Sequence, residues 1–334
     1  MRKPQTERIA FVVSRSSGMD ETWTTIHLAH RAASLGYDVR FMTPGDIEVS
    51  PSGRVVTRTD VVDPVPPTRA DLADALTRRL LPRRYTEVAQ IDLALLRLNP
   101  LTQSVLGSTL LLAPPDGAGP VIVNDPAGIA RTSTKAWLAT LTDVPQPRTI
   151  VTRSRASAEL FANNIGGPVV VKPAIGSGGR GVFLARSFGA LSGILDRMLA
   201  ATFSPVVVQQ YVPEAVHGEK RLFLVDATIV GAYRRLRHAG EFRHNLRQGG
   251  QPEPCEIDES DRRIAALLGP HLARNGIRIA GLDVIGEKLV EVNTLNPGGL
   301  HFAELFGGGD LSGRVLRQLL EAATQSPAQQ SLPS

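Results

Sequence analysis

Residues 280–300 read AGLDVIGEKLVEVNTLNPGGL, a pattern that predicts two short apolar strands joined by a tight turn at Gly286-Glu287-Lys288. Asp283 lies in the first strand, and Glu291 and Asn293 lie in the second. Because strand side chains alternate between faces, Glu291 and Asn293 point the same way, and hairpin pairing can bring Asp283 beside them. Carboxylate and amide oxygens are ligands that Mg²⁺ takes while it keeps further positions for phosphate. The alternative is a half-exposed hairpin with its acids in water.

Length and composition limit the classes of protein to consider. A chain of 334 residues is long enough for two or three lobes. The net charge of +5 comes mainly from arginine residues, which form no continuous block of basic residues. We therefore expect no nucleic-acid partner, but we do expect anionic small molecules as partners. The single cysteine, Cys255, excludes an intramolecular disulfide and a cysteine-based metal site. Neither a membrane-spanning run nor a signal-type apolar segment is present, so we expect a cytoplasmic location and no membrane partner.

The first part of the chain has the pattern of a parallel α/β lobe. A strand at 8–13 is followed by a polar loop, a helix at 21–35 that ends at Gly36, and a strand at 37–42. Another buried strand is predicted at 91–98, with Arg97 near its carboxyl end. A buried arginine is costly unless it is paired, so Arg97 either forms a structural ion pair or faces an anionic ligand.

Further elements are expected along the rest of the chain. We predict strands at 121–124, 169–173, 182–185 and 206–211, a hairpin at 222–225 and 228–233, and helices at 69–85, 132–141, 191–199, 258–275 and 312–323.

A glycine-rich loop, AIGSGGRG at 174–181, connects two of these strands. Walker loops and dinucleotide fingerprints hold phosphate at a helix N-terminus, so a loop between strands is neither of them. Such a hairpin can instead fold over phosphates and offer backbone N–H groups, as a lid does, although an ordinary glycine-rich turn has the same composition.

Charged residues near this loop complete a pattern suited to a nucleoside triphosphate. Lys172 directly precedes the loop and Lys135 lies one segment upstream, so two ammonium groups accompany the lid. Arg221 and Arg235 lie between the lid and the acidic hairpin, where they can stabilise a transferred phosphoryl group. Each residue alone is more often a surface residue; the ordered set favours a nucleotide site.

This ordered set resembles the ATP-grasp superfamily and, within it, bacterial glutathione synthetase, over residues 8–320. The segments that carry the resemblance are LLRLNP at 95–100, VIVNDPAGIARTSTKAWLATL at 121–141, VVVKPAIGSGGRGVF at 169–183, VVVQQYVPEAVHGEKRLFLVD at 206–226, EFRHNLRQGG at 241–250 and IAGLDVIGEKLVEVNTLNPGG at 279–299. The last two are the most specific.

The resemblance implies an α/β protein with the ATP-grasp fold. Its lobes would be a Rossmann-like pre-ATP-grasp lobe at 1–120, a central lobe with the glycine-rich lid at 121–205, and a C-terminal lobe with the magnesium site at 206–323, before a disordered tail at 324–334. Because members of the family often form symmetric oligomers, a homo-oligomer is expected.

The resemblance also implies roles for individual residues. Asp283, Glu291 and Asn293 would hold Mg²⁺, with Mn²⁺ as an alternative, and Arg221 and Arg235 would be catalytic. The residues that would contact ATP are Lys135, Lys172, Gly176, Gly178, Gly179, Gln209, Gln210, Tyr211, Val212 and Glu219. Those that would face the substrates are Arg97, Arg243, Asn245, Pro297, Gly298 and Gly299.

The implied activity is an ATP-dependent carboxylate–amine ligation through an acyl phosphate, joining γ-glutamylcysteine to glycine. Three stretches depart from the family pattern: SRSSGMD at 14–20, LNP at 98–100 and TLNPGGL at 294–300. All three belong to the substrate side. They leave open a related peptide ligase with another donor or acceptor in specialised metabolism. A nucleotide-binding protein without ligase activity is the alternative from another class.

Overall fold

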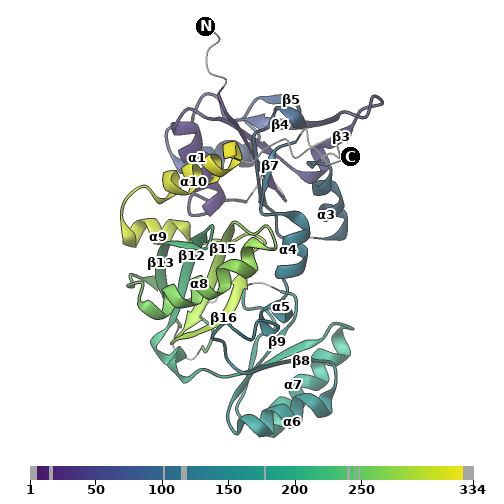
Figure 1. Cartoon of the computed structure of the whole chain (residues 1–334), viewed down its shortest axis with the longest axis vertical. Helices are drawn as coiled ribbons and strands as arrows, with labels where there is room; N and C mark the ends of the chain where they lie inside the picture. Colours follow the sequence, from purple (N-terminus) through teal and green to yellow (C-terminus); the bar gives the residue numbers. More distant parts are fainter. Residues whose placement is uncertain are drawn as a thin grey trace, which may run out of the picture. The chain divides into compact units, whose positions relative to one another are not determined.

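The computed structural model describes residues 6–14, 18–100, 102–113, 119–176, 178–238, 241–244, 246 and 249–325, with side chains described up to residue 321. The chain divides into two compact units (Figure 1). The first unit comprises residues 1–129, 276–279 and 295–334, and the second comprises residues 130–275 and 280–294. Among the described residues, no helix is both long enough and apolar enough to cross a bilayer.

The first unit is built on a seven-stranded sheet. Its strands are β1 (Arg8–Val13), β2 (Asp38–Met42), β3 (Ile47–Val49), β4 (Val55–Val61), β5 (Arg83–Glu87), β6 (Leu93–Arg97) and β7 (Val121–Val123). They lie in the order β3-β4-β2-β1-β6-β7, with β5 paired to β4. Strand β1 runs parallel to both β2 and β6, and β6 runs parallel to β7, so the predicted parallel α/β lobe is confirmed.

Helices surround this sheet. They are α1 (Thr24–Ser34), α2 (Arg69–Arg78), α3 (Gln103–Leu110), α4 (Pro126–Thr132, whose last three residues are assigned to the second unit), α9 (Leu300–Gly307) and α10 (Leu311–Gln325). Although α1 and α10 come from opposite ends of the chain, they lie side by side (Figure 1). Val315, Leu316 and Leu319 of α10 are fully buried, so this last helix belongs to the core of the unit.

The second unit contains two antiparallel sheets. The four-stranded sheet has the order β10-β9-β11-β8, with β8 at Thr149–Thr152, β9 at Val169–Pro173, β10 at Phe183–Ala185 and β11 at Val206–Gln210. Helices α6 (Arg155–Ile165) and α7 (Phe188–Ala201) cover one face of it (Figure 1). Val171, Leu195 and Val208 are among the buried side chains of the apolar core between the helices and the sheet.

The five-stranded sheet has the order β14-β13-β12-β15-β16. Its strands are β12 (Glu219–Val225), β13 (Thr228–Leu236), β14 (Gln251–Glu253), β15 (Ile279–Ile285) and β16 (Lys288–Asn293); the unit also contains α5 (Lys135–Ala139) and α8 (Glu259–Ala273). The predicted hairpin at 280–293 is confirmed as β15 and β16. Gly286 supplies its turn with a φ of +58°, a left-handed conformation that favours glycine.

Two element predictions were wrong in part. The helix predicted at 69–85 ends at Arg78, because Arg79 adopts a left-handed conformation and Arg83 then begins β5. There Arg83 pairs with Asp60 of β4 in register and by a 2.9 Å ion pair. The helix predicted at 132–141 is the shorter α5, capped by Thr134. Helices α3, α4, α6 and α9 were not predicted, and residues 326–334 lie outside the described part of the chain.

Candidate active site

The hairpin of β15 and β16 carries a buried charged cluster. Asp283 lies directly opposite Glu291 in the strand register. Its Oδ1 accepts hydrogen bonds from Arg221 Nη1 at 2.7 Å and from Arg235 Nη2 at 2.6 Å. Both arginines come from the neighbouring hairpin of β12 and β13, and Arg235 also pairs with Glu219 of β12. The sheet therefore brings together five of the predicted site residues.

Electrostatics within the cluster follow from burial. Burial alone disfavours the guanidinium of Arg235, but Asp283 and Glu219 outweigh it, and the net pKa of Arg235 is raised. Burial raises the pKa of Glu219 to about 7, against the opposing effect of Arg235. Each charge here depends on a partner of opposite sign, as buried ion pairs require.

The three predicted metal ligands lie together. Asn293 Nδ2 lies 3.2 Å from Asp283 Oδ2. Rotation of the side-chain amide by half a turn exchanges its nitrogen and oxygen, so Asn293 can place its oxygen at the same position. Among the described residues, no cluster of three or more His, Cys, Asp or Glu side chains has an arrangement suited to a metal. Two carboxylates and an amide still fit Mg²⁺, because this ion takes one or two carboxylates and completes its shell with water and substrate phosphates.

The two predicted lysines lie beside the lid and the hairpin. Lys135 Nζ donates to the carbonyl of Gly176 at 2.8 Å and lies 3.4 Å from Glu291 Oε1. Lys172 Nζ donates to the carbonyl of Val290 at 3.2 Å. Burial lowers the pKa of Lys172, which makes its ammonium group dependent on nearby anions.

The lid joins β9 to β10, as predicted. Gly176, Gly178 and Gly179 all have positive φ, which permits the loop to reverse direction. The Gly179 carbonyl accepts a hydrogen bond from Arg243 Nη1 at 3.0 Å, so Arg243 contacts the lid. Glu241 binds the other end of this guanidinium at 2.6 Å. Asn245, the remaining predicted residue of this stretch, lies outside the described residues.

The segment after β11 packs on the acidic hairpin. Gln209 Nε2 donates to Thr149 Oγ1 at 3.0 Å, and the Gln210 N–H donates to the Arg148 carbonyl at 2.9 Å. Tyr211 and Val212 belong to a small apolar cluster that also contains Ile285 and Val290.

A cavity of about 10 Å³ lies among these groups. Its lining includes Lys135, Lys172, Gln209 and Glu291. This volume holds about one water molecule. A nucleoside triphosphate is far larger than this cavity, which does not accommodate one in the conformation described.

The first unit holds Arg97 in a different environment. Its side chain is buried, its Nε donates to Thr25 Oγ1 at 3.1 Å, and its Nη2 donates to the Pro297 carbonyl at 2.8 Å. Burial lowers the pKa of Arg97 to about 9. Among the described residues, no carboxylate pairs with the Arg97 guanidinium. Of the two alternatives predicted for Arg97, the structural ion pair is therefore not formed by these contacts.

The loop that contacts Arg97 leads into α9. Gly299 has a φ of +115° and caps the helix, and the Leu300 N–H donates to Thr24 Oγ1 at 3.3 Å. Pro297, Gly298 and Gly299 therefore form a turn fixed between Arg97 and α1.

His244 of the second unit was not predicted as a site residue from the sequence. His244 is buried, its Nε2 lies 2.7 Å from the Ala215 carbonyl, and its Nδ1 lies 3.8 Å from Glu219 Oε2. Burial lowers its pKa. The only signal was its position between Arg243 and Asn245 in the segment EFRHNLRQGG.

Comparisons with known proteins match both units. The family model for the N-terminal domain of prokaryotic glutathione synthetase matches residues 8–130, and the model for its ATP-grasp domain matches residues 135–305.

Individual relatives agree with these models. Glutathione synthetase from Agrobacterium fabrum is 34% identical over 193 residues, which cover 58% of this chain and 60% of that protein. Glutathione synthetase from Mesorhizobium japonicum is 31% identical over 228 residues, which cover 68% and 72%. The crystal structure of D-alanine–D-alanine ligase from Bacillus anthracis complexed with ATP has a TM-score of 0.57 at 16% identity, covering 96% of this chain and all of that one, and thus shares the fold.

Proposed function

The chain belongs to the prokaryotic glutathione synthetase family, and from this premise we propose that it forms an amide bond between a carboxylate and an amine while ATP is converted to ADP and phosphate. An ADP-forming ATP-grasp ligase is the class of enzyme that this family represents. The observation that carries the proposal is the cluster of Asp283, Arg221 and Arg235, which combines a metal-binding carboxylate with two guanidinium groups.

The proposed nucleotide site lies in the second unit. Lys135 and Lys172 would pair with phosphate oxygens, and Gly176, Gly178 and Gly179 would close over them. The segment Gln209–Gln210–Tyr211–Val212 would lie beside adenine, and Glu219 near the ribose. In support, Lys135 already contacts both the lid and the acidic hairpin. Among the described residues, the one hydrogen-bond acceptor of the buried Lys172 ammonium is a carbonyl, which favours a further anionic partner.

Asp283, Glu291 and Asn293 would hold Mg²⁺, or Mn²⁺ in its place. Bound there, the ion would neutralise phosphate charge and orient the γ-phosphoryl group. Arg221 and Arg235 are already aimed at Asp283, so their guanidinium groups would lie next to the phosphoryl group that is transferred.

The proposed reaction has two steps. An oxygen of the donor carboxylate attacks the γ-phosphorus, the bond from that phosphorus to the bridging oxygen of ADP breaks, and an acyl phosphate forms. The acceptor amine then attacks the acyl carbon, phosphate leaves with the C–O bonding electrons, and the amine nitrogen loses a proton. No side-chain nucleophile is required, because positioning and charge neutralisation carry the reaction.

The substrates are small amino-acid or peptide molecules, and we propose γ-glutamylcysteine as donor and glycine as acceptor. Arg97 would bind a donor carboxylate, supported by its burial without an acidic partner. Pro297, Gly298 and Gly299 of the first unit would face a substrate, and Arg243 and Asn245 of the second unit are likewise proposed as substrate-facing residues.

The departures at 14–20, 98–100 and 294–300 support the second candidate, a peptide ligase of this family with another donor or acceptor. We retain the three-lobe division at 1–120, 121–205 and 206–323, a homo-oligomer and a cytoplasmic location as parts of the proposal.

The first experiment measures phosphate release from ATP and Mg²⁺ with γ-glutamylcysteine and each common amino acid as acceptor. Turnover with glycine alone, together with glutathione detected by mass spectrometry, is the expected result. Silence across the panel with ATP still bound would favour the second candidate. ATP binding without positional isotope exchange in ATP, for every carboxylate in a broad panel of donors, would contradict ligase activity.

The role of Arg235 is tested separately with Arg235→Ala. We expect nucleotide binding to persist while acyl-phosphate formation is suppressed. A defect confined to ATP affinity would contradict a catalytic role.

A further inference from the structure

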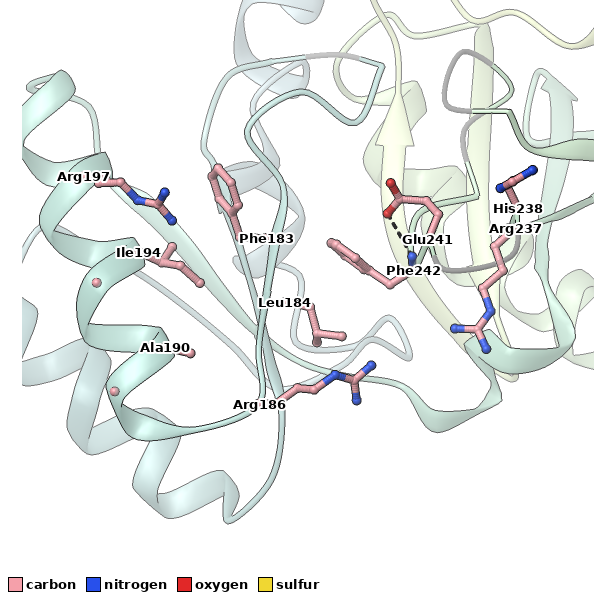
Figure 2. A pocket seen from close by; sticks show the side chains of 12 residues that line it. Phe183, Leu184, Arg186, Ala190, Ile194, Arg197, Arg237, His238, Glu241 and Phe242 are labelled. Atoms are coloured by element: carbon pink, nitrogen blue, oxygen red, sulfur yellow. Dashed lines mark hydrogen bonds between the residues drawn. The ribbon is translucent and has the colours of Figure 1, made fainter.

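A cavity of about 960 Å³ lies in the second unit, outside the cluster around Asp283 (Figure 2). Its lining comes from β10, from α7 and from the stretch after β13, and it includes Phe183, Leu184, Arg186, Arg197, Arg237 and Phe242. None of these six residues has a part in the proposed ligase chemistry. The volume suits a ligand larger than a single amino acid.

The cavity runs along the free edge of β10. Consecutive strand residues point to opposite faces of a sheet, and both Phe183 and Leu184 line this cavity. A space that contacts both faces of one strand lies along its edge. In agreement, β10 is the terminal strand of the order β10-β9-β11-β8, and β9 is its only strand partner among the described residues. Its outward backbone N–H and C=O groups therefore face the cavity.

The lining carries positive charge that the described residues do not balance. Within that part of the chain, Arg186, Arg197 and Arg237 form no ion pair with a carboxylate. The guanidinium of Arg197 lies over the ring of Phe183, 5.4 Å from its centroid, which leaves its N–H groups available.

Glu241 also lines the cavity but does not neutralise it. Its carboxylate accepts hydrogen bonds from Arg243 Nη2 at 2.6 Å and from the backbone N–H groups of Phe242 at 2.8 Å and Arg243 at 3.1 Å. Figure 2 shows the Glu241 side chain turned toward its own backbone. The three arginines are thus left for a ligand.

The remaining walls have room and apolar surface. Gly189, Ala190 and Gly193 of α7 border the cavity beside Ile194 and Arg197 of the same helix, so part of the helix surface there carries only small residues. Phe183 and Phe242 come from different segments of the unit and supply apolar contacts (Figure 2).

From these observations we propose that the cavity is a docking groove for an extended acidic peptide, which adds a strand to β10 and pairs its carboxylates with Arg186, Arg197 and Arg237. Strand addition supplies backbone hydrogen bonds, and alternate side chains supply specificity. The free strand edge favours a peptide over a nucleic acid, which offers no matching backbone amides. The inference goes beyond the proposed ligase and does not depend on which amide that ligase forms.

The test measures binding of a fluorescein-labelled peptide of about eight alternating Glu and Val residues by fluorescence anisotropy, without nucleotide. The full-length protein is expected to bind this peptide and not its Lys–Val counterpart. The double variant Arg186→Glu/Arg237→Glu should weaken binding about tenfold or more, because each carboxylate then meets a like charge. The matched control Arg262→Glu/Arg263→Glu changes the same charge on exposed positions of α8 and should bind as the wild type does.

A second readout separates strand addition from loose charge attraction. Peptide binding should protect the β10 amide hydrogens that do not pair with β9 from hydrogen exchange. Binding that is equally strong in the double variant, absence of this protection, or tighter binding of a labelled oligonucleotide or of inorganic phosphate at the same arginines would each overturn the proposal. Phosphate release by both variants is measured in parallel, so a failure of the ligase assignment is seen separately.

Discussion

Two buried arginines, one in each unit, have nearly equal exposure and opposite electrostatics. Arg235 is 4% exposed and contacts Asp283 and Glu219, which raise its pKa. Arg97 is 5% exposed, and within the described part of the chain its side chain donates hydrogen bonds to the neutral oxygens of Thr25 and Pro297 and to no carboxylate; burial lowers its pKa to about 9. The second unit thus contains the counter-charges of its own cluster. The described part of the first unit provides no such counter-charge for Arg97.

The largest effect is expected from Glu291→Gln. Removing one of two carboxylate metal ligands should lower turnover by about 10³-fold or more and raise the Mg²⁺ concentration needed for ATP binding. Phosphate release and a Mg²⁺ titration of nucleotide binding measure both. The control is Glu287→Gln in the exposed turn of the same hairpin. Near-normal turnover of Glu291→Gln would remove the metal assignment.

A stability measurement compares the two arginines directly. Arg235→Met leaves the buried carboxylates of Asp283 and Glu219 without one of their partners and should lower the free energy of unfolding by about 3 kcal/mol. Arg97→Met removes a buried cation that has no carboxylate partner, so its free energy of unfolding should stay within about 1 kcal/mol of the wild type. Urea unfolding of both variants gives the values. An equal loss of unfolding free energy in the two variants would show that the carboxylate partners of Arg235 make no difference to stability.

The same Arg97→Met variant sharpens the functional side of the comparison. If Arg97 binds a donor carboxylate, kcat/KM for the donor should fall about 100-fold, as expected for loss of a charge-assisted hydrogen-bonded pair. ATP affinity should not change, because the proposed nucleotide residues all belong to the second unit. Isothermal titration with ATP beside steady-state kinetics separates the two quantities. A loss of ATP affinity equal to the loss for the donor would argue against the assignment.

The smallest effect concerns His244, a neutral group inside the charged cluster. Burial lowers its pKa below the ordinary 6.5, so the unfolded chain binds more protons below that pH. The contribution of His244 to the free energy of unfolding is therefore fully present above pH 6.5. Below that pH the free energy of unfolding falls by at most about 1.4 kcal/mol per pH unit. Urea unfolding between pH 7.5 and 5.5 should show a shallower pH dependence for His244→Gln than for the wild type. The exposed His217→Gln should follow the wild type, and identical slopes for all three proteins would contradict the prediction.

The sequence predicted the acidic hairpin well because its signal is local. Alternating apolar residues on both sides of Gly286 specify two strands, and strand geometry then brings Asp283 and Glu291 together. The lid and Lys172 were predictable for the same reason. The pairing of Arg235 with Glu219 was not, because it depends on the register of β12 against β13, which no short motif encodes.

The stretch at 69–85 was misassigned because its structure depends on contacts with a distant strand. Its arginine-rich composition favours a helix, and only the ladder with β4 makes Arg83–Glu87 a strand. His244 escaped notice because burial of a histidine in a loop depends on tertiary packing. The cavity beside β10 also escaped, since its three arginines come from separate segments and resemble ordinary surface residues in sequence.

The path of the chain has a consequence for how this protein is made. The first unit begins with β1 but is completed only by residues 295–325, whose helix α10 lies against α1 with Val315, Leu316 and Leu319 fully buried. On a ribosome the N-terminal sheet therefore stays incomplete, with the α10-facing side of α1 exposed, until residues 295–325 have emerged. The whole second unit, residues 130–275 and 280–294, is synthesised during that interval. Chaperone dependence during translation should accordingly concentrate on the first unit, the one that starts the chain.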